Sequence, residues 1–422
     1  MPVFVPYDEK EFTLVAIDVA KARHDILIQF PSGKRKKLKI TSTAKDYHTF
    51  IQDLKSLGTP CIVGLEATAD YHRTIAYYLQ MAGFTVYFVS SLAVARTREA
   101  LHNSWDKNDS KDTQVILHLL RTGVVQKYYD PLIHQFNDVQ EISKTYHQLS
   151  LRKVKIQHSI MNHYLPLYFP EVEKYFHTSR AQWFTTVLLH FPNPSAISKY
   201  TLEKFLQVAW PIVGRKVNKR GWLVDFYNTA KESIGLPVPE SSQAICMFKI
   251  ILQEHQGLCG RLKEIENLAE TYLKENQDYH YLKTIPGIGP ILALTILAEA
   301  GNIRRFSHFR QFLNFCGLDL CTHQSGYFRG QSKLSKHGNS RLRYAFWIAG
   351  SVAIRMRENT FRKKFDSYTK RDPLNADLKR KAYTAVAAKM ARVVYSIIKN
   401  EQVYRCSFEP VISSGRIASV VP

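Results

Sequence analysis

Four acidic side chains in the first third of the chain have the types and spacing of a divalent-metal site. Asp18 lies within an apolar segment, VAIDVA, and Glu66 lies near the end of a second one, VGLEA. A lone carboxylate on a buried strand needs a partner or a cation, because its desolvation is unfavourable. Asp109 and Asp112 begin an apolar-periodic segment and share one face of a helix. Together these oxygen ligands predict a site for Mg²⁺ or Mn²⁺, ions that assist phosphoryl transfer.

The two helix-start acids also have a purely structural interpretation. Acidic residues in the first turn of a helix are stabilised by the helix dipole, and an Asp there often caps the helix. For Asp109 and Asp112 alone, capping is the simpler hypothesis. Their combination with Asp18 and Glu66 favours the metal site.

A glycine-containing turn lies between two apolar stretches in the segment YLKTIPGIGPILALTILAEAG. Gly287 and Gly289 predict a tight helical hairpin whose second helix begins near Pro290. Free backbone amides at such a helix start can bind a phosphate, and glycine allows a close approach of the strand. A turn that only packs two core helices together is the alternative.

Five basic residues follow within a glycine-punctuated segment of fifteen residues, which predicts a phosphate-contacting loop leading into a helix. They are Arg329, Lys333, Lys336, Arg341 and Arg343. The longer segment GLDLCTHQSGYFRGQSKLSKHGNSRLR offers several candidate nucleophilic serines. Composition alone does not choose among Ser325, Ser332, Ser335 and Ser340.

The charge of the chain favours a polyanionic partner. Its 422 residues include 58 Lys and Arg against 36 Asp and Glu, for a net charge of +22. Residues 281–422 contain 24 of these basic residues and 8 of the acidic ones, a net charge of +16, which leaves +6 for residues 1–280. This asymmetry predicts a nucleic-acid-binding surface in the C-terminal part.

The elements that must position these residues follow from the hydrophobic pattern. Residues 12–42 predict a three-stranded meander, and the chain to residue 90 then alternates helix and strand. This order predicts an α/β domain with a mixed sheet and helices on its faces, the arrangement of ribonuclease-H-like domains among others. Heptad-like spacing over 139–160 and 244–269 predicts two long helices that pair as an antiparallel arm, join protomers or lie on a bundle core.

Cysteine usage and hydropathy indicate the compartment. The six cysteines show neither a CxxC motif nor dense spacing, which argues against a disulfide framework. No secretory signal and no apolar segment of membrane-spanning length are evident. We therefore expect a cytoplasmic protein without a membrane partner.

The motifs together resemble the "one-ten" family of bacterial insertion-sequence transposases. The resemblance rests on AIDVAK, VGLEATADYH, DKNDSKDT, IPGIGP, QSG and SKHGNSRLR, and it covers nearly the whole chain. It implies a RuvC-like DEDD domain in residues 1–130, a helical and coiled-coil oligomerisation region in 131–280, and a mainly helical transposase domain in 281–410.

Residue by residue, the resemblance places the DEDD set on Asp18, Glu66, Asp109 and Asp112. It places a basic residue on Lys107 and the nucleophile on Ser325. Leu320 stands where the family usually has proline, which puts the loop geometry in doubt.

The resemblance also implies an activity and partners. Ser325 would attack a DNA phosphate, leaving a covalent phosphoserine and a free 3′-hydroxyl. A structured noncoding RNA would select the DNA by base pairing, and we expect a homodimer or homotetramer.

Two other functions remain open on the sequence. A RuvC-like nuclease or junction resolvase would use the acidic residues to activate water and would not need the serine. A non-enzymatic nucleic-acid-binding protein would need only the basic C-terminal part.

Overall fold

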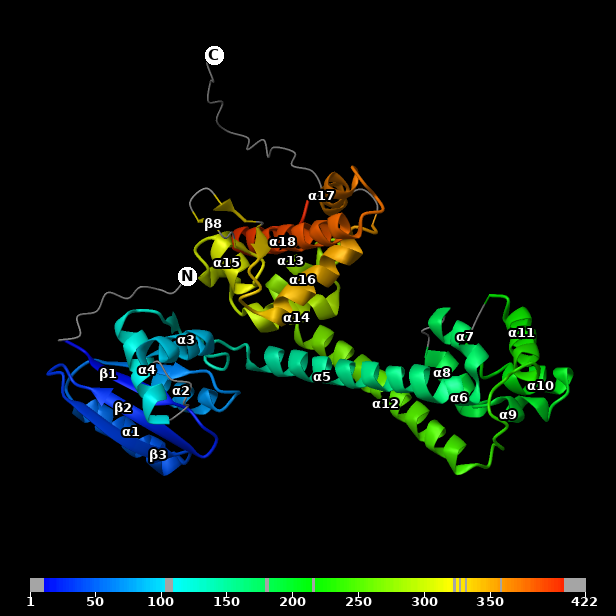
Figure 1. Ribbon diagram of the computed structural model, residues 1–422, viewed down its shortest axis with the longest axis horizontal. Coiled ribbons are helices and arrows are strands. Elements are labelled where there is room, and N and C mark those ends of the chain that lie inside the picture. Colours follow the sequence, from blue (N-terminus) through cyan, green and yellow to red (C-terminus); the bar gives the residue numbers. More distant parts are fainter. Residues whose placement is uncertain are drawn as a thin grey trace, which may run out of the picture. The chain divides into compact units, whose positions relative to one another are not determined.

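The chain forms two compact units, residues 1–137 and 138–422, in a computed structural model (Figure 1). The structure describes residues 11–102, 109–178, 182–214, 217–321, 324–325, 328–330, 332–356 and 359–405. The predicted division into three domains remains a prediction, although two separate hydrophobic clusters lie within the second unit.

The first unit is built on a six-stranded mixed sheet in the order β3-β2-β1-β4-β5-β6. The meander is antiparallel, whereas β4 and β5 run parallel to β1. The strands are β1 (Thr13–Asp18), β2 (Arg23–Gln29), β3 (Arg35–Thr41), β4 (Cys61–Glu66), β5 (Thr85–Val89) and β6 (Gln126–Lys127). The strand pattern of the sequence therefore predicts five of these strands correctly, and it did not predict β6.

Helices cover both faces of the sheet, as Figure 1 shows. Alternate side chains of β1 enter opposite cores, because successive residues of a strand point to opposite faces. Val15 and Ile17 pack with α1 (Ala44–Ser56) and α2 (His72–Met81), whereas Leu14 and Ala16 pack beneath α4 (Asp109–Arg121). A further helix, α3 (Ser91–His102), packs against α4. The predicted α/β class with a mixed sheet is confirmed.

Two long helices of the second unit run antiparallel. They are α5 (Asn137–Ser159) and α12 (Gln243–Tyr272). Tyr272 donates a hydrogen bond to Asp138 at one end of this pair, and Tyr146 donates to Glu266 farther along. Burial and this carboxylate raise the pKa of Tyr146 to about 12. The helices predicted from heptad spacing are present, and they pair as an antiparallel arm.

A compact helical cluster fills the chain between these two helices. Its core is rich in aromatic side chains, including Phe184, Trp222 and Phe226, which contact one another edge to face or stacked. Its elements are η1 (Ile160–Tyr164), α6 (Leu165–Tyr168), η2 (Pro170–Val172), α7 (Glu173–Thr178), α8 (Gln182–His190), α9 (Pro194–Ser198), α10 (Leu202–Ala209) and α11 (Lys219–Lys231). The sequence pattern did not predict this cluster.

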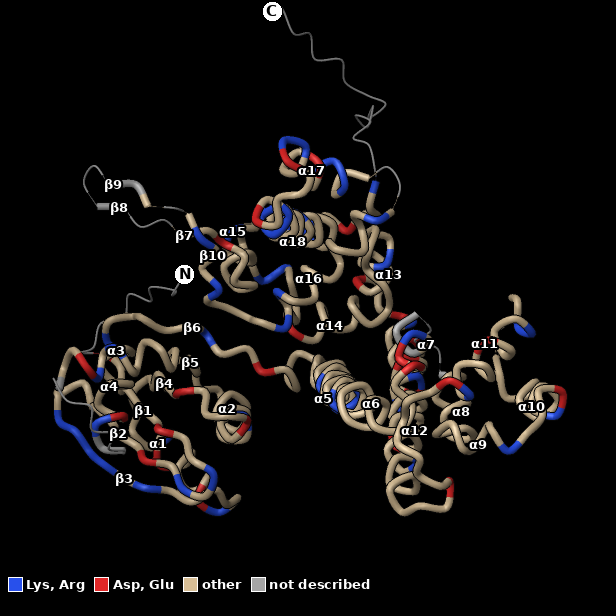
Figure 2. Tube along the Cα trace, turned by 45° about the vertical axis from the view of Figure 1, so that its right-hand side comes forward, with Lys and Arg blue, Asp and Glu red and all other residues tan. Residues whose placement is uncertain are grey.

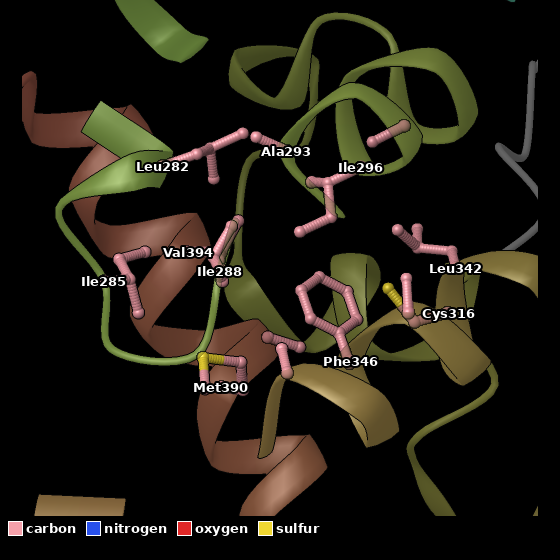
Figure 3. Packing of buried hydrophobic residues seen from close by; sticks show 14 of the residues in the cluster. Leu282, Ile285, Ile288, Ala293, Ile296, Cys316, Leu342, Phe346, Met390 and Val394 are labelled. Carbon is pink, nitrogen blue, oxygen red and sulfur yellow. The ribbon is translucent and has the colours of Figure 1, made fainter. Parts of the chain in front are cut away.

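The remaining part is mainly helical, as predicted, and its elements pack around a second core. Figure 3 shows Ile285 and Ile288 of a turn near Met390 and Val394 of the long helix α18, with Phe346 close by. The helices are α13 (Gln277–Lys283), α14 (Pro290–Ala300), η3 (Ile303–Arg305), α15 (Phe309–Phe315), α16 (Ser340–Ala353), α17 (Thr360–Thr369) and α18 (Ala376–Asn400). Among the described residues, no helix is both long and apolar enough to cross a lipid bilayer.

Candidate functional site

Two residues of the predicted metal site end neighbouring parallel strands. Asp18 is the last residue of β1 and Glu66 is the last residue of β4. The register pairs Ile17 with Leu65, so Asp18 and Glu66, the next residue of each strand, lie at the same edge of the sheet. Strand alternation places both on the face that α4 covers, and both residues are half-buried.

A third carboxylate, which the sequence analysis did not select, lies opposite Asp18. Asp25 of β2 pairs with Asp18 in the antiparallel register and therefore faces the same side of the sheet. Its carboxylate forms an ion pair with Lys39 of β3 at 2.9 Å. The sequence signal for Asp25 is its place near the start of the second predicted strand, HDILIQF, which pairs with the strand that ends at Asp18.

The helix α4 begins at Asp109, as the apolar periodicity predicted. It packs closely on the sheet, because a Cβ added at Gly64 would lie 3.2 Å from the Cδ atoms of Leu120. The side chain of Asp109 and the whole of Lys107 lie outside the described residues. Their proposed roles stay predictions.

Asp112 is buried, with 2% of its surface exposed, and it is engaged by an arginine. The Nε of Arg98 donates to Asp112 Oδ1 at 2.6 Å, and Arg98 Nη2 lies 2.5 Å from the same oxygen. Arg98 belongs to α3 and was not selected from the sequence. The guanidinium therefore supplies the positive charge that this buried carboxylate requires.

The described part of the chain does not contain a preformed metal cluster. Within it, no three His, Cys, Asp or Glu side chains lie close enough together to hold a metal ion. Asp18 and Glu66 fit a hard divalent cation by donor type and by their shared position, whereas Asp112 is held by Arg98. The metal site as predicted is therefore supported only in part.

The predicted helical hairpin is present as α13, a turn and α14. Gly287 in the turn has φ +87°, and a Cβ there would lie 2.2 Å from the carbonyl oxygen of Ala349 on α16. Gly287 is therefore required for packing. Gly289 is the N-cap of α14, has φ −91° and has open space around its Cα, which leaves it accessible to a ligand.

The segment with the candidate serine forms a ladder of two short antiparallel strand pairs. The outer pair is β7 (Leu320–Cys321) with β10 (Lys333–Leu334), and the inner pair is β8 (Gln324–Ser325) with β9 (Phe328–Arg329). Ser325 pairs with Phe328 across the tip. The side chains of Ser325 and Arg329 lie outside the described residues.

The four described basic residues of this segment have different environments. Lys333 and Lys336 are exposed. Arg343 Nη1 instead donates to the carbonyl oxygen of Lys336 at 3.1 Å. Arg341 lies 2.6 Å from Glu299 of α14 and also donates to Ser143 of α5. The contacts of these two arginines favour a structural role, whereas Lys333 and Lys336 are accessible to a phosphate.

Comparison with known proteins gives matches to two family models. A transposase model of the DEDD type matches residues 15–170, and the model described as "Transposase IS116/IS110/IS902 family" matches residues 279–366. The first match includes the whole acidic set, and the second includes the hairpin and the serine segment.

Several curated relatives from bacteria have names that describe them as transposases. The transposase for insertion sequence element IS1111A of Coxiella burnetii is 27% identical over 180 residues, which are 42% of this chain and 47% of that protein. The chain thus spans about half the length of this relative. A protein assigned as the mini-circle transposase for IS117 of Streptomyces coelicolor is 24% identical over 363 residues, which are 80% of this chain and 83% of that one.

Among solved structures, RuvC from T. thermophilus in complex with a Holliday junction substrate matches 28% of this chain and 99% of its own, at 9% identity and a TM-score of 0.21. On the two family matches, which fall on separate parts of the molecule, the chain belongs to the IS116/IS110/IS902 family of transposases.

Proposed function

We propose that this protein is a DNA transposase that excises and inserts an insertion-sequence element by cutting and rejoining DNA strands. The observation that carries the proposal is the placement of Asp18 and Glu66 at the ends of two neighbouring parallel strands, on the face covered by α4. Carboxylates so placed can bind a divalent cation beside a phosphodiester.

The acidic residues would hold Mg²⁺ or Mn²⁺. Asp18, Glu66 and Asp109 are the proposed ligands. Asp112 would join them only when its ion pair with Arg98 is broken. A bound cation would neutralise charge on the phosphate and favour ionisation of an attacking hydroxyl.

Ser325 is the proposed nucleophile, on the strength of the family resemblance. Its Oγ attacks phosphorus, the bond from phosphorus to the 3′-oxygen breaks, and the 3′-oxygen leaves as a hydroxyl. The serine proton is lost and a proton is gained by the 3′-oxygen, so the step is balanced. The phosphoserine linkage conserves the bond energy for rejoining.

The proposed partners are the DNA of the element ends and target, a structured guide RNA, and further copies of this chain as a dimer or tetramer. Net charge supports a nucleic-acid partner without distinguishing RNA from DNA. For self-association, the arm exposes apolar side chains that include Leu151, Val154, Met247 and Ile250. A monomer by light scattering with nucleic acid bound would contradict the oligomer.

The decisive experiment is capture of a covalent protein–DNA adduct on labelled element-end DNA. We expect the adduct with the wild-type protein and with Ser332→Ala, and none with Ser325→Ala. Asp18→Asn and Glu66→Gln should also abolish it. Strand cleavage that persists without an adduct in Ser325→Ala would favour the nuclease alternative, and unchanged products with Asp18→Asn would remove the acidic residues from catalysis.

A further inference from the structure

A basic groove lies beside the strand ladder that carries Ser325. It has a volume of about 900 Å³ and is bounded by β10 on one side and by α17 and α18 on the other. Lys333 and Lys336 line it from the loop side. The two helices add five more cations, namely Lys364, Arg380, Lys381, Lys389 and Arg392. Figure 2 shows the basic residues along α17 and α18.

The positive charge of this groove is poorly compensated. Among the described residues that line it, none is acidic. Arg380 has an ion pair with Asp377, but both side chains are more than 70% exposed, so the pair is weak and screened by salt. Burial, followed by the charge of Lys364, lowers the pKa of Lys389. A bound polyanion would stabilise neighbouring cations such as Lys364 and Lys389.

The groove is elongated along α18. One face of α18 lines the groove with residues at helical spacing, namely Lys381, Ala385, Ala388 and Arg392. The two small alanine side chains leave room between the two cations. From Lys381 to Arg392 the helix rises about 16 Å. Cations that far apart can each contact a different phosphate of one strand. The cations are therefore spaced for a phosphate backbone and not for a single small anion.

A second hollow of about 320 Å³ adjoins the groove and shares Leu318, Leu334 and Thr384 with it. It is lined by Tyr344 and Trp347 of α16, which are 61% and 41% exposed. Their rings lie almost parallel, at an interplanar angle of 12° with centroids 6.2 Å apart. Large exposed aromatic side chains beside a cationic groove are typical of surfaces that bind single strands, because every unpaired base has a face that can stack.

We propose that the groove and the adjoining aromatic hollow together bind an unpaired DNA strand next to the phosphate that Ser325 attacks, with phosphates on Lys381 and Arg392 and a base on Trp347. The proposal rests on the proposed function for its choice of DNA, because β10 both lines the groove and anchors the ladder of Ser325. A duplex would present its stacked bases edge-on and leave the aromatic faces unused.

The test measures binding, by fluorescence anisotropy, of a labelled single-stranded DNA to the full-length protein without divalent metal. Trp347→Ala and Tyr344→Ala remove the stacking surface, and Lys381→Ala/Arg392→Ala removes two phosphate contacts. The matched controls lie elsewhere in the same unit. Trp210→Ala removes another exposed tryptophan, 47% exposed and beneath Lys219, and Lys263→Ala removes an exposed lysine of α12.

We expect Trp347→Ala to weaken single-strand binding about tenfold, which is the loss of one stacked base. Lys381→Ala/Arg392→Ala should weaken binding and reduce the slope of log affinity against log salt by about 1.4. The control variants should bind as the wild type does. Equal affinities for the groove variants and the controls would overturn the proposal.

Two further binding measurements use a DNA duplex of the same sequence and a single-stranded RNA. A loss of duplex binding equal to the loss of single-strand binding in Trp347→Ala would overturn the single-strand assignment. A loss of single-stranded RNA binding in Trp347→Ala that is larger than the loss of single-stranded DNA binding would overturn the choice of DNA. Ser325→Ala should bind normally, so failure of serine catalysis and failure of the groove give different results.

Discussion

Arg98 of α3 holds Asp112 of α4 through two contacts to a single carboxylate oxygen, Oδ1. The side chains are 16% and 3% exposed, so this is a buried ion pair. Removal of one partner from such a pair leaves an uncompensated charge in the interior. The acid that the sequence assigns to metal binding is thus also an acid on which the packing of α3 against α4 depends.

Arg98→Ala should therefore lower the free energy of unfolding by about 3–5 kcal/mol. Urea denaturation of the full chain measures the loss. If Asp112 binds the catalytic cation, Mg²⁺ should restore stability to Arg98→Ala and not to Arg98→Ala/Asp112→Asn. No response to Mg²⁺ in either variant would assign Asp112 a structural role only.

The two glycines of the hairpin turn should respond differently to alanine. Gly287→Ala adds a methyl group 2.2 Å from the carbonyl oxygen of Ala349 and places alanine at φ +87°, so we expect a loss of about 1–3 kcal/mol or more. Gly289→Ala meets open space at φ −91° and should fold normally. Thermal unfolding compares the two.

The same two glycine variants distinguish a packing role of the turn from a role in phosphate binding. If a backbone phosphate approaches the start of α14, Gly289→Ala should weaken DNA binding while its melting temperature stays unchanged. A Gly289→Ala protein with normal affinity would leave the turn with a packing role alone.

Replacement of Arg341 and of Lys336 by alanine should have different effects on the stability of the protein and on its binding to DNA. Arg341 links α16 to Glu299 of α14 and Ser143 of α5, with a quarter of its side chain exposed, so Arg341→Ala should cost about 1.5–3 kcal/mol. Lys336 is exposed, so Lys336→Ala should weaken DNA binding by the protein and leave its stability unchanged. Denaturation and anisotropy on both variants test this, and the reverse assignment would contradict it.

The sheet and the location of its acids were predictable from the sequence. Alternation of apolar and polar residues sets the strands, and because Asp18 and Glu66 lie at the ends of two buried strands, parallel pairing brings them to one edge. The long helices followed in the same way from their apolar periodicity. These are local patterns, which a single sequence displays directly.

The partners of charged side chains were not predictable. Arg341 and Ser143 are 198 positions apart, and nothing in either local segment marks the other. The groove was missed for a related reason. The helical spacing of Lys381, Lys389 and Arg392 is visible in the sequence. Residues 281–422 are basic throughout, however, and only the folded structure shows which of their cations share one surface.

Buried histidines should make the fold sensitive to acid. Burial lowers the pKa of His255 below 6.5, assisted by the charge of Lys153, and burial likewise lowers the pKa of His24 and His72. With the folded pKa below the unfolded one, the unfolded chain binds more protons at pH values between the two. Stability should therefore fall as the pH drops below about 6.5, by up to about 1.4 kcal/mol per pH unit for each histidine.

Urea denaturation at pH 7.5 and pH 5.5 measures this effect, with His255→Leu as the variant and His48→Leu as the control. His255 is 5% exposed, its Nε2 has no hydrogen-bond partner in the described structure, and its Nδ1 lies 3.3 Å from Thr185 Oγ1. Leucine removes that contact at both pH values and should reduce the loss of stability on acidification. His48 is exposed, and its replacement should leave the loss unchanged. If the two variants lose the same stability between these pH values, protonation of His255 is not a source of the acid sensitivity.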